Sequence, residues 1–371
     1  MNSLLNDKHI RVERGPVTVQ SIKSKAAAAL GLIRPPFALL VLMFAQLGAS
    51  QSGNRLRLTT TVTLVTAVAG WILAVVSMNE LGDEDVDSHN IDRQNARPLV
   101  TGALSRIQMW TIVGTCSAAA TVAASLLGRA ALVTVLGGLV LGAAYSLPPL
   151  RLSRRGPATS LLLPLGYVTV PFMMGAFAAS RNGIPAPTPG TTAAGTWMLI
   201  TGLYVSFLGR LLLKDFRDLE GDMLYGKRTF LVRYGRITTI SVSSALWVIG
   251  GIPIVAAARS AELAVSYGLG AAVALWLLNR LAGSADDHTD DVLIAAVAAV
   301  GRSVLLATIA LYETRLVSAP AWAAITLVGG SVALGLIGTQ RYIGELDLAA
   351  VTPLRGDARR DHVRYSLQDN S

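Results

Sequence analysis

The stretch from Leu58 to Asp87 reads LTTTVTLVTAVAGWILAVVSMNELGDEDVD. Residues 58–78 carry no charge and are long enough to cross the hydrocarbon core of a bilayer as a helix. An acidic motif then begins at once, with Asn79, Asp83 and Asp87 spaced four residues apart. Carboxylates beside a bilayer are costly unless cations neutralise them, so this stretch predicts a membrane helix that ends in a charged binding site.

The whole chain has the composition of a membrane protein. Of its 371 residues, 52% are hydrophobic and only 15% are charged, whereas a soluble protein carries roughly a quarter of charged residues. In the bilayer core each span must be a helix, because no water is present to satisfy the backbone. The sequence therefore predicts an all-α polytopic bundle of nine to ten spans around a central cavity. The ten candidate spans are 28–50, 58–78, 107–127, 131–147, 160–180, 191–213, 237–258, 262–279, 292–313 and 320–338.

Positive charge predicts how the bundle is oriented. Lys and Arg concentrate in the segments that lie in the cytoplasm if the N-terminus does. We expect a cytoplasmic tail over 1–27, a membrane domain over 28–338 and a second cytoplasmic tail over 339–371. Topology also explains the net charge of +9, and we expect no nucleic-acid partner. Both acidic motifs then face the cytoplasm.

The second acidic motif is DFRDLEGD, from Asp215 to Asp222. In a helix, Asp215, Asp218 and Asp222 share one face, as Asn79, Asp83 and Asp87 do in the first motif. Like charges this close repel one another. Mg²⁺ makes their clustering favourable, because it binds one or two carboxylates together with a substrate's phosphates. Either motif taken alone could be an ordinary solvated loop, but two on one membrane side favour a shared site for Mg²⁺ and a diphosphate.

Several stretches resemble the UbiA-type intramembrane prenyltransferases. The first motif is similar to that family's N-D-x-x-D-x-x-x-D signature, with Glu80 in place of an Asp. The similarity also covers Arg34-Pro35, Asn95–Gly102 (NARPLVTG), Tyr145–Leu152 (YSLPPLRL) and Lys214–Thr229, the last in the form closest to the homogentisate prenyltransferase and chlorophyll synthase branches. That family usually has nine spans, fewer than the ten counted here.

The resemblance implies Mg²⁺-dependent transfer of an allylic prenyl group from its diphosphate to a small aromatic or lipid-like acceptor in the membrane. Tyr145 would lie near the reacting carbon, with Asp83 and Asp222 as the central carboxylates. The implied metal ligands are Asn79, Asp83, Asp87, Asp215, Asp218 and Asp222. The implied diphosphate-binding residues are Asn79, Arg34, Arg93, Arg97, Lys214 and Lys227.

Other functions remain open from the sequence. A terpene cyclase on the same scaffold would use the prenyl diphosphate without an acceptor, and a polar acceptor such as a sugar phosphate is a further alternative. A transporter is disfavoured because the acids gather at span ends. Arg302 lies within a span, where it is either cavity-facing or part of a structural pair. The acidic loop 286–291 favours helix capping over metal binding, and Gly138-x-x-x-Gly142 indicates close helix packing.

Overall fold

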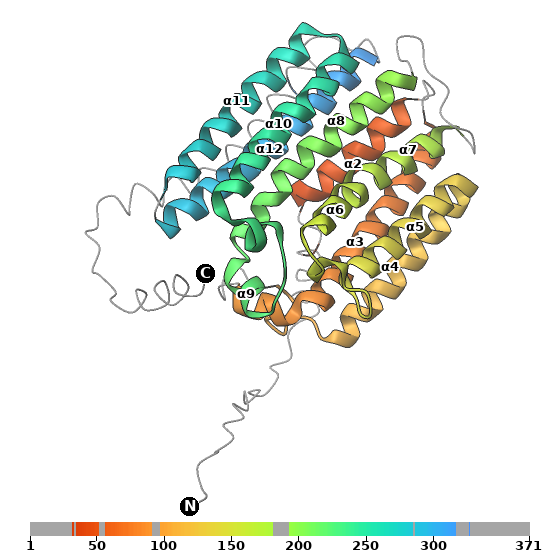
Figure 1. Ribbon diagram of the computed structural model, residues 1–371. Helices are drawn as coiled ribbons and strands as arrows, with labels where there is room; N and C mark the ends of the chain where they lie inside the picture. Colours follow the sequence, from red (N-terminus) through yellow and green to blue (C-terminus); the bar gives the residue numbers. More distant parts are fainter. Residues whose placement is uncertain are drawn as a thin grey trace, which may run out of the picture.

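The described part of the chain is a bundle of helices without a strand (Figure 1). The computed structural model describes residues 32, 35–51, 56–90, 97–180, 193–284, 286–316 and 326. The long helices are α2 (Pro35–Ser50), α3 (Leu58–Asn90), α4 (Arg106–Leu127), α5 (Arg129–Ser146), α7 (Val170–Ser180), α8 (Ala193–Leu212), α10 (Phe230–Ala258), α11 (Ala261–Gly283) and α12 (Asp287–Leu316). The short elements are η1 (Leu152–Arg154), η2 (Pro157–Leu161), α6 (Leu162–Pro164), η3 (Leu165–Thr169), η4 (Leu213–Phe216) and α9 (Leu219–Leu224).

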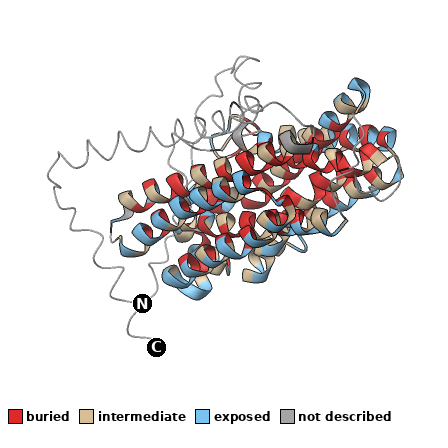
Figure 2. Ribbon diagram, turned by 90° about the horizontal axis from the view of Figure 1, so that it is seen from above, coloured by how far each residue is buried: buried red, intermediate tan, exposed pale blue. Residues whose placement is uncertain are grey.

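Among the residues that the structure describes, eight helical segments are long and apolar enough to cross a membrane, and the apolar helix Phe37–Ser50 is a shorter one. Nine of the ten predicted spans coincide with these helices, and the tenth, 320–338, lies outside the described residues apart from Thr326. Large apolar side chains such as Trp110, Val122 and Trp276 are exposed, as lipid-facing residues would be. Figure 2 shows exposed positions along the outer faces of the helices.

Glycines let the helices approach closely. A Cβ added to Gly48 of α2 would lie 1.9 Å from the carbonyl oxygen of Phe172 in α7, and one added to Gly175 would lie 1.8 Å from that of Ala45. The predicted close packing at Gly138 and Gly142 is confirmed: added Cβ atoms there would meet the Trp71 and Val75 side chains of α3 at 2.5 and 2.7 Å. Small residues at these positions allow the backbone contacts that hold membrane helices together.

Two predicted spans are less regular than expected. The span over 160–180 consists of η2, α6, η3 and α7 in succession, with Pro164 and Pro171 inside it. The span over 237–258 belongs to a longer helix, α10, which begins at Phe230 and is broken at Gly235 by a φ of 76° and a ψ of 174°. Only glycine adopts that conformation without strain, so Gly235 separates the short first part of α10 from the membrane helix that follows.

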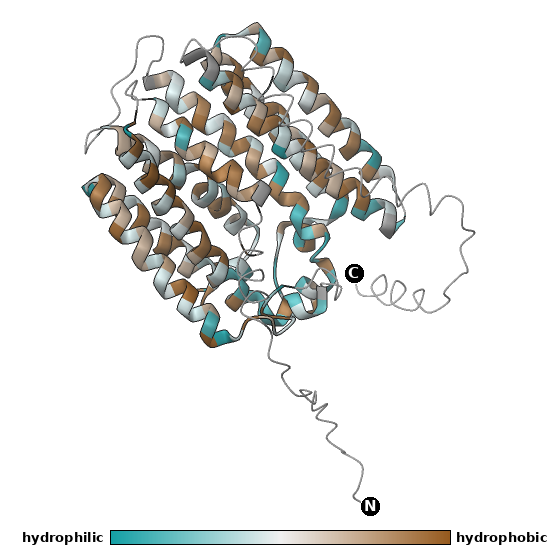
Figure 3. Ribbon diagram, turned by 180° about the vertical axis from the view of Figure 1, so that it is seen from behind, coloured by the Kyte–Doolittle hydropathy of each residue, from teal (hydrophilic) through white to brown (hydrophobic). Residues whose placement is uncertain are grey.

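Polar residues gather at one end of the bundle, where α9 lies beside the C-terminal end of α3 (Figures 1 and 3). Both acidic motifs are at this end. The buried hydrophobic residues form separate clusters: Phe44, Phe207 and Trp247 belong to one and Trp71 to another, each at 1% exposure or less.

Candidate active site

The first acidic motif lies on an unbroken helix, as predicted. Helix α3 continues past its apolar part to Asn90, so the acidic residues are a direct extension of the span. Asp83 and Asp87 are 7% and 3% exposed, whereas Asp85, on the opposite side of the helix, is exposed. Asn79 lies one turn deeper and lines an apolar cavity. The four-residue spacing therefore places these three side chains on the inner face of the bundle.

Gly82 brings the end of α5 against this face. A Cβ at Gly82 would lie 2.2 Å from the carbonyl oxygen of Ser146, so no larger residue fits without a shift of the backbone. Arg151 follows in the loop and donates a hydrogen bond from Nη2 to the Gly82 carbonyl at 3.1 Å. Tyr145, the neighbour of Ser146, thereby lies close enough to Asp83 to interact with it electrostatically.

The second acidic motif does not form one helical face, and that prediction is wrong. Residues Leu213–Phe216 form a 3-10 turn, the chain leaves helical geometry at Asp218, and α9 then runs over only six residues. Backbone hydrogen bonds link the pieces, from Asp218 N to Asp215 O at 3.2 Å and from Asp222 N to Asp218 O at 2.8 Å. Asp222 is 1% exposed, while Arg217 and Glu220 are exposed.

Lys227 joins the two motifs. Its Nζ lies 3.0 Å from Asp83 Oδ1 and 3.4 Å from Asp222 Oδ1, and all three residues are buried. Burial raises the pKa of the Asp222 carboxyl, and the Lys227 ammonium opposes that rise. Carboxylates far apart in the sequence are thus held around one cation, which is the juxtaposition that the two motifs predicted.

Arg97 neutralises negative charge in the first motif. Its Nη1 lies 2.8 Å from Glu80 Oε1 and 3.0 Å from Asp87 Oδ2. Burial alone would lower the pKa of Arg97, but Glu80, Asp87 and Asp218 together raise it. Glu80, which differs from the family's usual Asp, is 2% exposed and holds this arginine.

Lys214 stands between the motifs and the aromatic residues below them. Its charge interacts with Asp218, Tyr145, Asp215 and Asp83, although the side chain retains a large accessible area. Asn79 and Tyr145 also line an apolar cavity, together with Trp71 and Tyr167 among others. Its empty space is about 330 Å³ when the part open to the outside is included.

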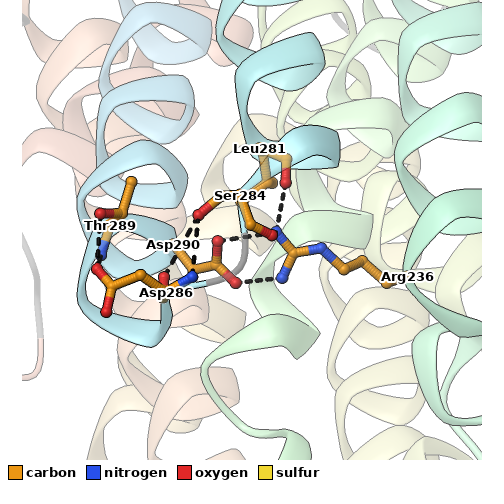
Figure 4. Close-up of polar contacts among 6 residues, drawn as sticks. All are labelled: Arg236, Leu281, Ser284, Asp286, Thr289 and Asp290. Carbon is orange, nitrogen blue, oxygen red and sulfur yellow. Dashed lines mark hydrogen bonds and ion pairs between the residues drawn. The ribbon is translucent and has the colours of Figure 1, made fainter.

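Arg236 braces the second motif through Phe216. Figure 4 shows its contacts with the loop between α11 and α12. Arg236 binds the Asp290 carboxylate with both terminal nitrogens and also donates to the carbonyl oxygens of Leu281 and Ser284. Its guanidinium carbon lies 5.9 Å from the centre of the Phe216 ring, within the second motif. The α11–α12 loop is therefore tied to the residues that precede Asp218.

The acidic loop 286–291 caps a helix, as expected. Asp286 Oδ2 accepts hydrogen bonds from the Thr289 amide at 2.8 Å and from the Thr289 hydroxyl at 2.7 Å (Figure 4). Asp290 points to Arg236 instead. The contacts of these two residues make the loop a structural support for the site.

Two predicted diphosphate ligands, Arg34 and Arg93, lie outside the described residues. Sequence analysis missed Arg151, Arg236 and Arg210 as supporting residues. Arg210 alone had a usable signal, because it is a charged residue within a predicted span. Arg151 lies in a loop and Arg236 near the start of α10, and only the fold shows that they contact Gly82 and Phe216.

The donor set fits Mg²⁺ bound together with a diphosphate. Within the described ranges, no three His, Cys, Asp or Glu residues form a ready-made metal cluster. Lys227 and Arg97 lie between the carboxylates instead. Mg²⁺ typically uses one or two carboxylates, waters and substrate phosphates, so pairs of hard oxygens facing one another suit it better than a closed cage. The buried Asp222 Oδ1 has no hydrogen bond in the described structure and only the longer contact to Lys227.

Comparison with known proteins agrees with this geometry. The model of the UbiA prenyltransferase family matches residues 35–300, and the chain belongs to that family. It is a multi-pass membrane protein.

Two curated relatives are similar over part of the chain. The homogentisate phytyltransferase of Synechocystis is 34% identical over 165 residues, which are 44% of this chain and 51% of that protein. The bacteriochlorophyll synthase 34 kDa chain of Chloroflexus aurantiacus is 28% identical over 46% of this chain and 51% of its own length. The chain thus spans about half the length of the curated relatives that it matches.

Solved structures share the fold over most of their length. A UbiA homologue from Aeropyrum pernix superimposes with a TM-score of 0.58 at 20% identity, over 76% of this chain and 98% of that one. A UbiA homologue from Archaeoglobus fulgidus bound to GPP and Mg²⁺ gives a TM-score of 0.55 at 20% identity, over 75% and 99%.

Proposed function

We propose that this protein transfers an allylic prenyl group from its diphosphate to an aromatic or quinone-precursor acceptor within the membrane, with Mg²⁺ as cofactor. The observation that carries the proposal is the bridge from Asp83 through Lys227 to Asp222, one helical turn from Asn79, which lines an apolar cavity. The two carboxylate motifs meet at one cationic residue near an apolar pocket. This arrangement suits a ligand with a highly charged head and an apolar tail.

The head of the substrate is held by residues of both motifs. Asp83, Asp87, Asp218 and Asp222, with Asn79 and Asp215 beside them, would hold Mg²⁺, which when bound supplies Lewis-acid stabilisation of the departing diphosphate. Lys227, Lys214 and Arg97 would add direct charge-assisted hydrogen bonds to phosphate oxygens. We extend this role to Arg34 and Arg93 from the sequence resemblance alone. Once phosphate oxygens compete for it, Lys227 can leave one carboxylate and contact the diphosphate.

The cavity suits the tail and the reaction. An allylic cation must avoid water, and a pocket lined by Trp71, Tyr145 and Tyr167 excludes it. The Tyr145 ring would lie near the cationic carbon and stabilise it by about 0.5–2 kcal/mol through its π face. The new bond forms when the acceptor's electron-rich carbon attacks that carbon and then loses its proton, while the diphosphate leaves with the bonding electrons.

The proposal includes a membrane orientation. Both motifs lie at one end of the bundle, where Lys227 contacts Asp83 and Asp222, Arg236 contacts Phe216, and Arg228 and Arg233 lie between Lys227 and Arg236 in the chain. The excess of basic residues on that side favours a cytoplasmic site.

Purified protein in detergent tests this function. The wild type is incubated with geranylgeranyl diphosphate, Mg²⁺ and a hydroquinone acceptor, and products are identified by mass spectrometry. We expect a prenylated acceptor and its loss with EDTA. Asp83→Ala and Asp222→Ala should each lower turnover by at least ~10²-fold, since each removes a preorganised charge from the diphosphate site.

The matched control is Asp85→Ala, which removes an exposed acid from the same helix and should leave turnover unchanged. Full activity of both Asp83→Ala and Asp222→Ala would contradict the proposal. A cyclised terpene formed from the diphosphate alone, with no acceptor product, would identify the cyclase alternative instead.

A further inference from the structure

Three arginines lie close together in the loop that follows α5. They are Arg151, Arg154 and Arg155, and the turn η1 lies among them. Arg151 donates a hydrogen bond to the carbonyl oxygen of Gly82, within the first acidic motif, so the loop lies at the polar end of the bundle. The loop therefore concentrates positive charge beside the membrane surface.

This cluster is separate from the cations of the acidic site. The buried carboxylates of Asp83 and Asp222 both interact with Lys227 and Lys214. No arginine of the loop is among the charges that act most strongly on either carboxylate. The loop thus presents positive charge that the two acidic motifs do not neutralise.

Backbone contacts hold two of the three arginines in place. Besides its bond to Gly82, Arg151 has a φ of 39°, in the left-handed region that residues with a side chain rarely adopt. Arg155 donates from Nε to the Leu150 carbonyl oxygen at 2.5 Å and from Nη2 to the Pro149 carbonyl oxygen at 3.1 Å. These bonds fold the loop back on itself and keep its charges together.

Arg154 has no such partners. Its Nε and Nη2 are buried without a hydrogen bond in the part of the chain that the structure describes, and so is Nε of Arg151. No described carboxylate forms an ion pair with Arg154. A buried guanidinium nitrogen that has lost water without gaining an acceptor is unfavourable. Since the side chain is partly exposed as a whole, it can turn toward an anion that approaches the loop.

Exposed apolar side chains lie on both sides of the arginines. Leu150 precedes them and is 46% exposed, whereas Leu161 and Leu165 follow at 47% and 39%. Leu161 and Leu165 belong to the membrane-spanning segment Pro157–Ser180, and η2, at its start, contacts η1. The arginines are therefore placed where the headgroups of a bilayer would begin, next to side chains that suit its acyl chains.

We propose that the loop arginines Arg151, Arg154 and Arg155 bind the phosphate of an anionic phospholipid, whose acyl chains lie against the exposed leucines. The planar fork of arginine matches phosphate oxygens, and basic pockets at the ends of membrane helices bind anionic headgroups. A zwitterionic lipid fits less well, because its ammonium group would face three guanidinium groups. A soluble phosphate would leave the leucines without a partner.

Lipid binding to purified full-length protein tests the site without catalysis. Native mass spectrometry of the protein in detergent measures bound dioleoyl phosphatidylglycerol and dioleoyl phosphatidylcholine, which have the same acyl chains and differ in headgroup charge. We expect the wild type to bind phosphatidylglycerol at least tenfold more tightly. Arg154→Gln should weaken that binding about tenfold, the effect of one charge-assisted hydrogen bond, and leave phosphatidylcholine binding unchanged.

Two further variants separate a specific site from general attraction or misfolding. Arg155→Gln alters an exposed arginine of the same loop and should also lower phosphatidylglycerol affinity, by roughly three- to tenfold. Arg228→Gln removes an equal charge from an exposed position outside the loop and should keep the wild-type preference. Thermal unfolding of each variant shows whether it is folded.

Several results would overturn the lipid site. These are equal affinity of the wild type for both lipids, unchanged affinity in both Arg154→Gln and Arg155→Gln, and an equal loss in Arg228→Gln. Glycerol 3-phosphate that bound as tightly as phosphatidylglycerol would assign the arginines to a soluble phosphate. Weaker binding of geranylgeranyl diphosphate with Mg²⁺ to Arg154→Gln would assign them to the prenyl donor instead.

Discussion

The two acidic motifs present similar carboxylates but are built in different ways. The first extends a membrane helix without a break, so the spacing of Asn79, Asp83 and Asp87 alone sets its inner face. The second is assembled from a 3-10 turn, an irregular link and the six-residue helix α9. A helix this short is not stable by itself, so contacts from elsewhere must position Asp218 and Asp222.

Those contacts come from the start of α10 and from the α11–α12 loop. Arg236, directly after the bend at Gly235, holds Asp290 and the ring of Phe216. Lys227 then ties Asp222 to the rigid helix of the first motif. The difference teaches that one half of the site is fixed by local helix geometry and close packing, and the other by long-range polar contacts.

The largest effect is expected from a substitution at Gly82, where the helix of the first motif packs against α5. Gly82→Ala would push the backbone of α5 away from α3, because the added methyl group would lie 2.2 Å from the Ser146 oxygen. Overpacking of this kind costs about 1–3 kcal/mol of unfolding free energy. The displacement of Tyr145 should also lower turnover roughly 100-fold. Thermal unfolding in detergent and the prenyl-transfer assay measure the two effects.

Gly137→Ala is the matched control for this substitution. It lies on an exposed part of α5 with open space around its Cβ position, so it should stabilise the protein by up to about 1 kcal/mol through helix propensity. Normal turnover in Gly82→Ala would show that the α3–α5 contact does not position Tyr145.

Loss of the brace at Arg236 should lower turnover less than the substitution at Gly82 does. Arg236→Gln removes the ion pair to Asp290, whose side chain is 12% exposed, and releases Phe216. We expect a loss of roughly 1–3 kcal/mol of stability, since a nearly buried carboxylate loses its partner. Turnover should fall about tenfold, and a higher Mg²⁺ concentration should restore part of it if the motif is displaced rather than destroyed.

Arg233→Gln provides the comparison, because Arg233 is exposed and its guanidinium stacks on the neighbouring Tyr234. It should change neither stability nor the Mg²⁺ requirement. If Arg236→Gln behaved in the same way, the second motif would not depend on this brace.

The link between the motifs should give the smallest but most specific effect, a change in pH dependence. Burial raises the pKa of Asp222 above the ordinary 3.8, so ionisation disfavours the folded state and stability falls as pH rises from 3.8 through the raised pKa. Lys227 opposes this rise. Lys227→Met should therefore steepen the fall in Tm of metal-free protein above about pH 4, relative to the wild type.

The Tm difference between Lys227→Met and the wild type should be larger at pH 8 than at pH 4, where the carboxyl is closer to neutral. Arg228→Gln, next in the chain but exposed, should track the wild type at all pH values. A constant Tm difference across this range would mean that Lys227 does not stabilise ionised carboxylates.

The sequence by itself determined the class of fold and half of the site. Apolar runs of membrane-spanning length leave a chain little choice other than helices, since the backbone must satisfy its own hydrogen bonds in lipid. Four-residue spacing on such a helix determines a face, so the arrangement of Asp83 and Asp87 was predictable. The excess of positive charge predicted an orientation, which stays a prediction.

Only the tertiary structure decided how the second motif is shaped and what surrounds it. Its helix is too short for periodicity to predict, and the partners Lys227–Asp83, Arg236–Phe216 and Arg210–Ala298 join residues distant in the chain. Polar contacts of this range carry no local signature, because they depend on where separate helices end in space. The helical spans followed from the demands of the bilayer, whereas the alignment of charges at their ends followed from packing.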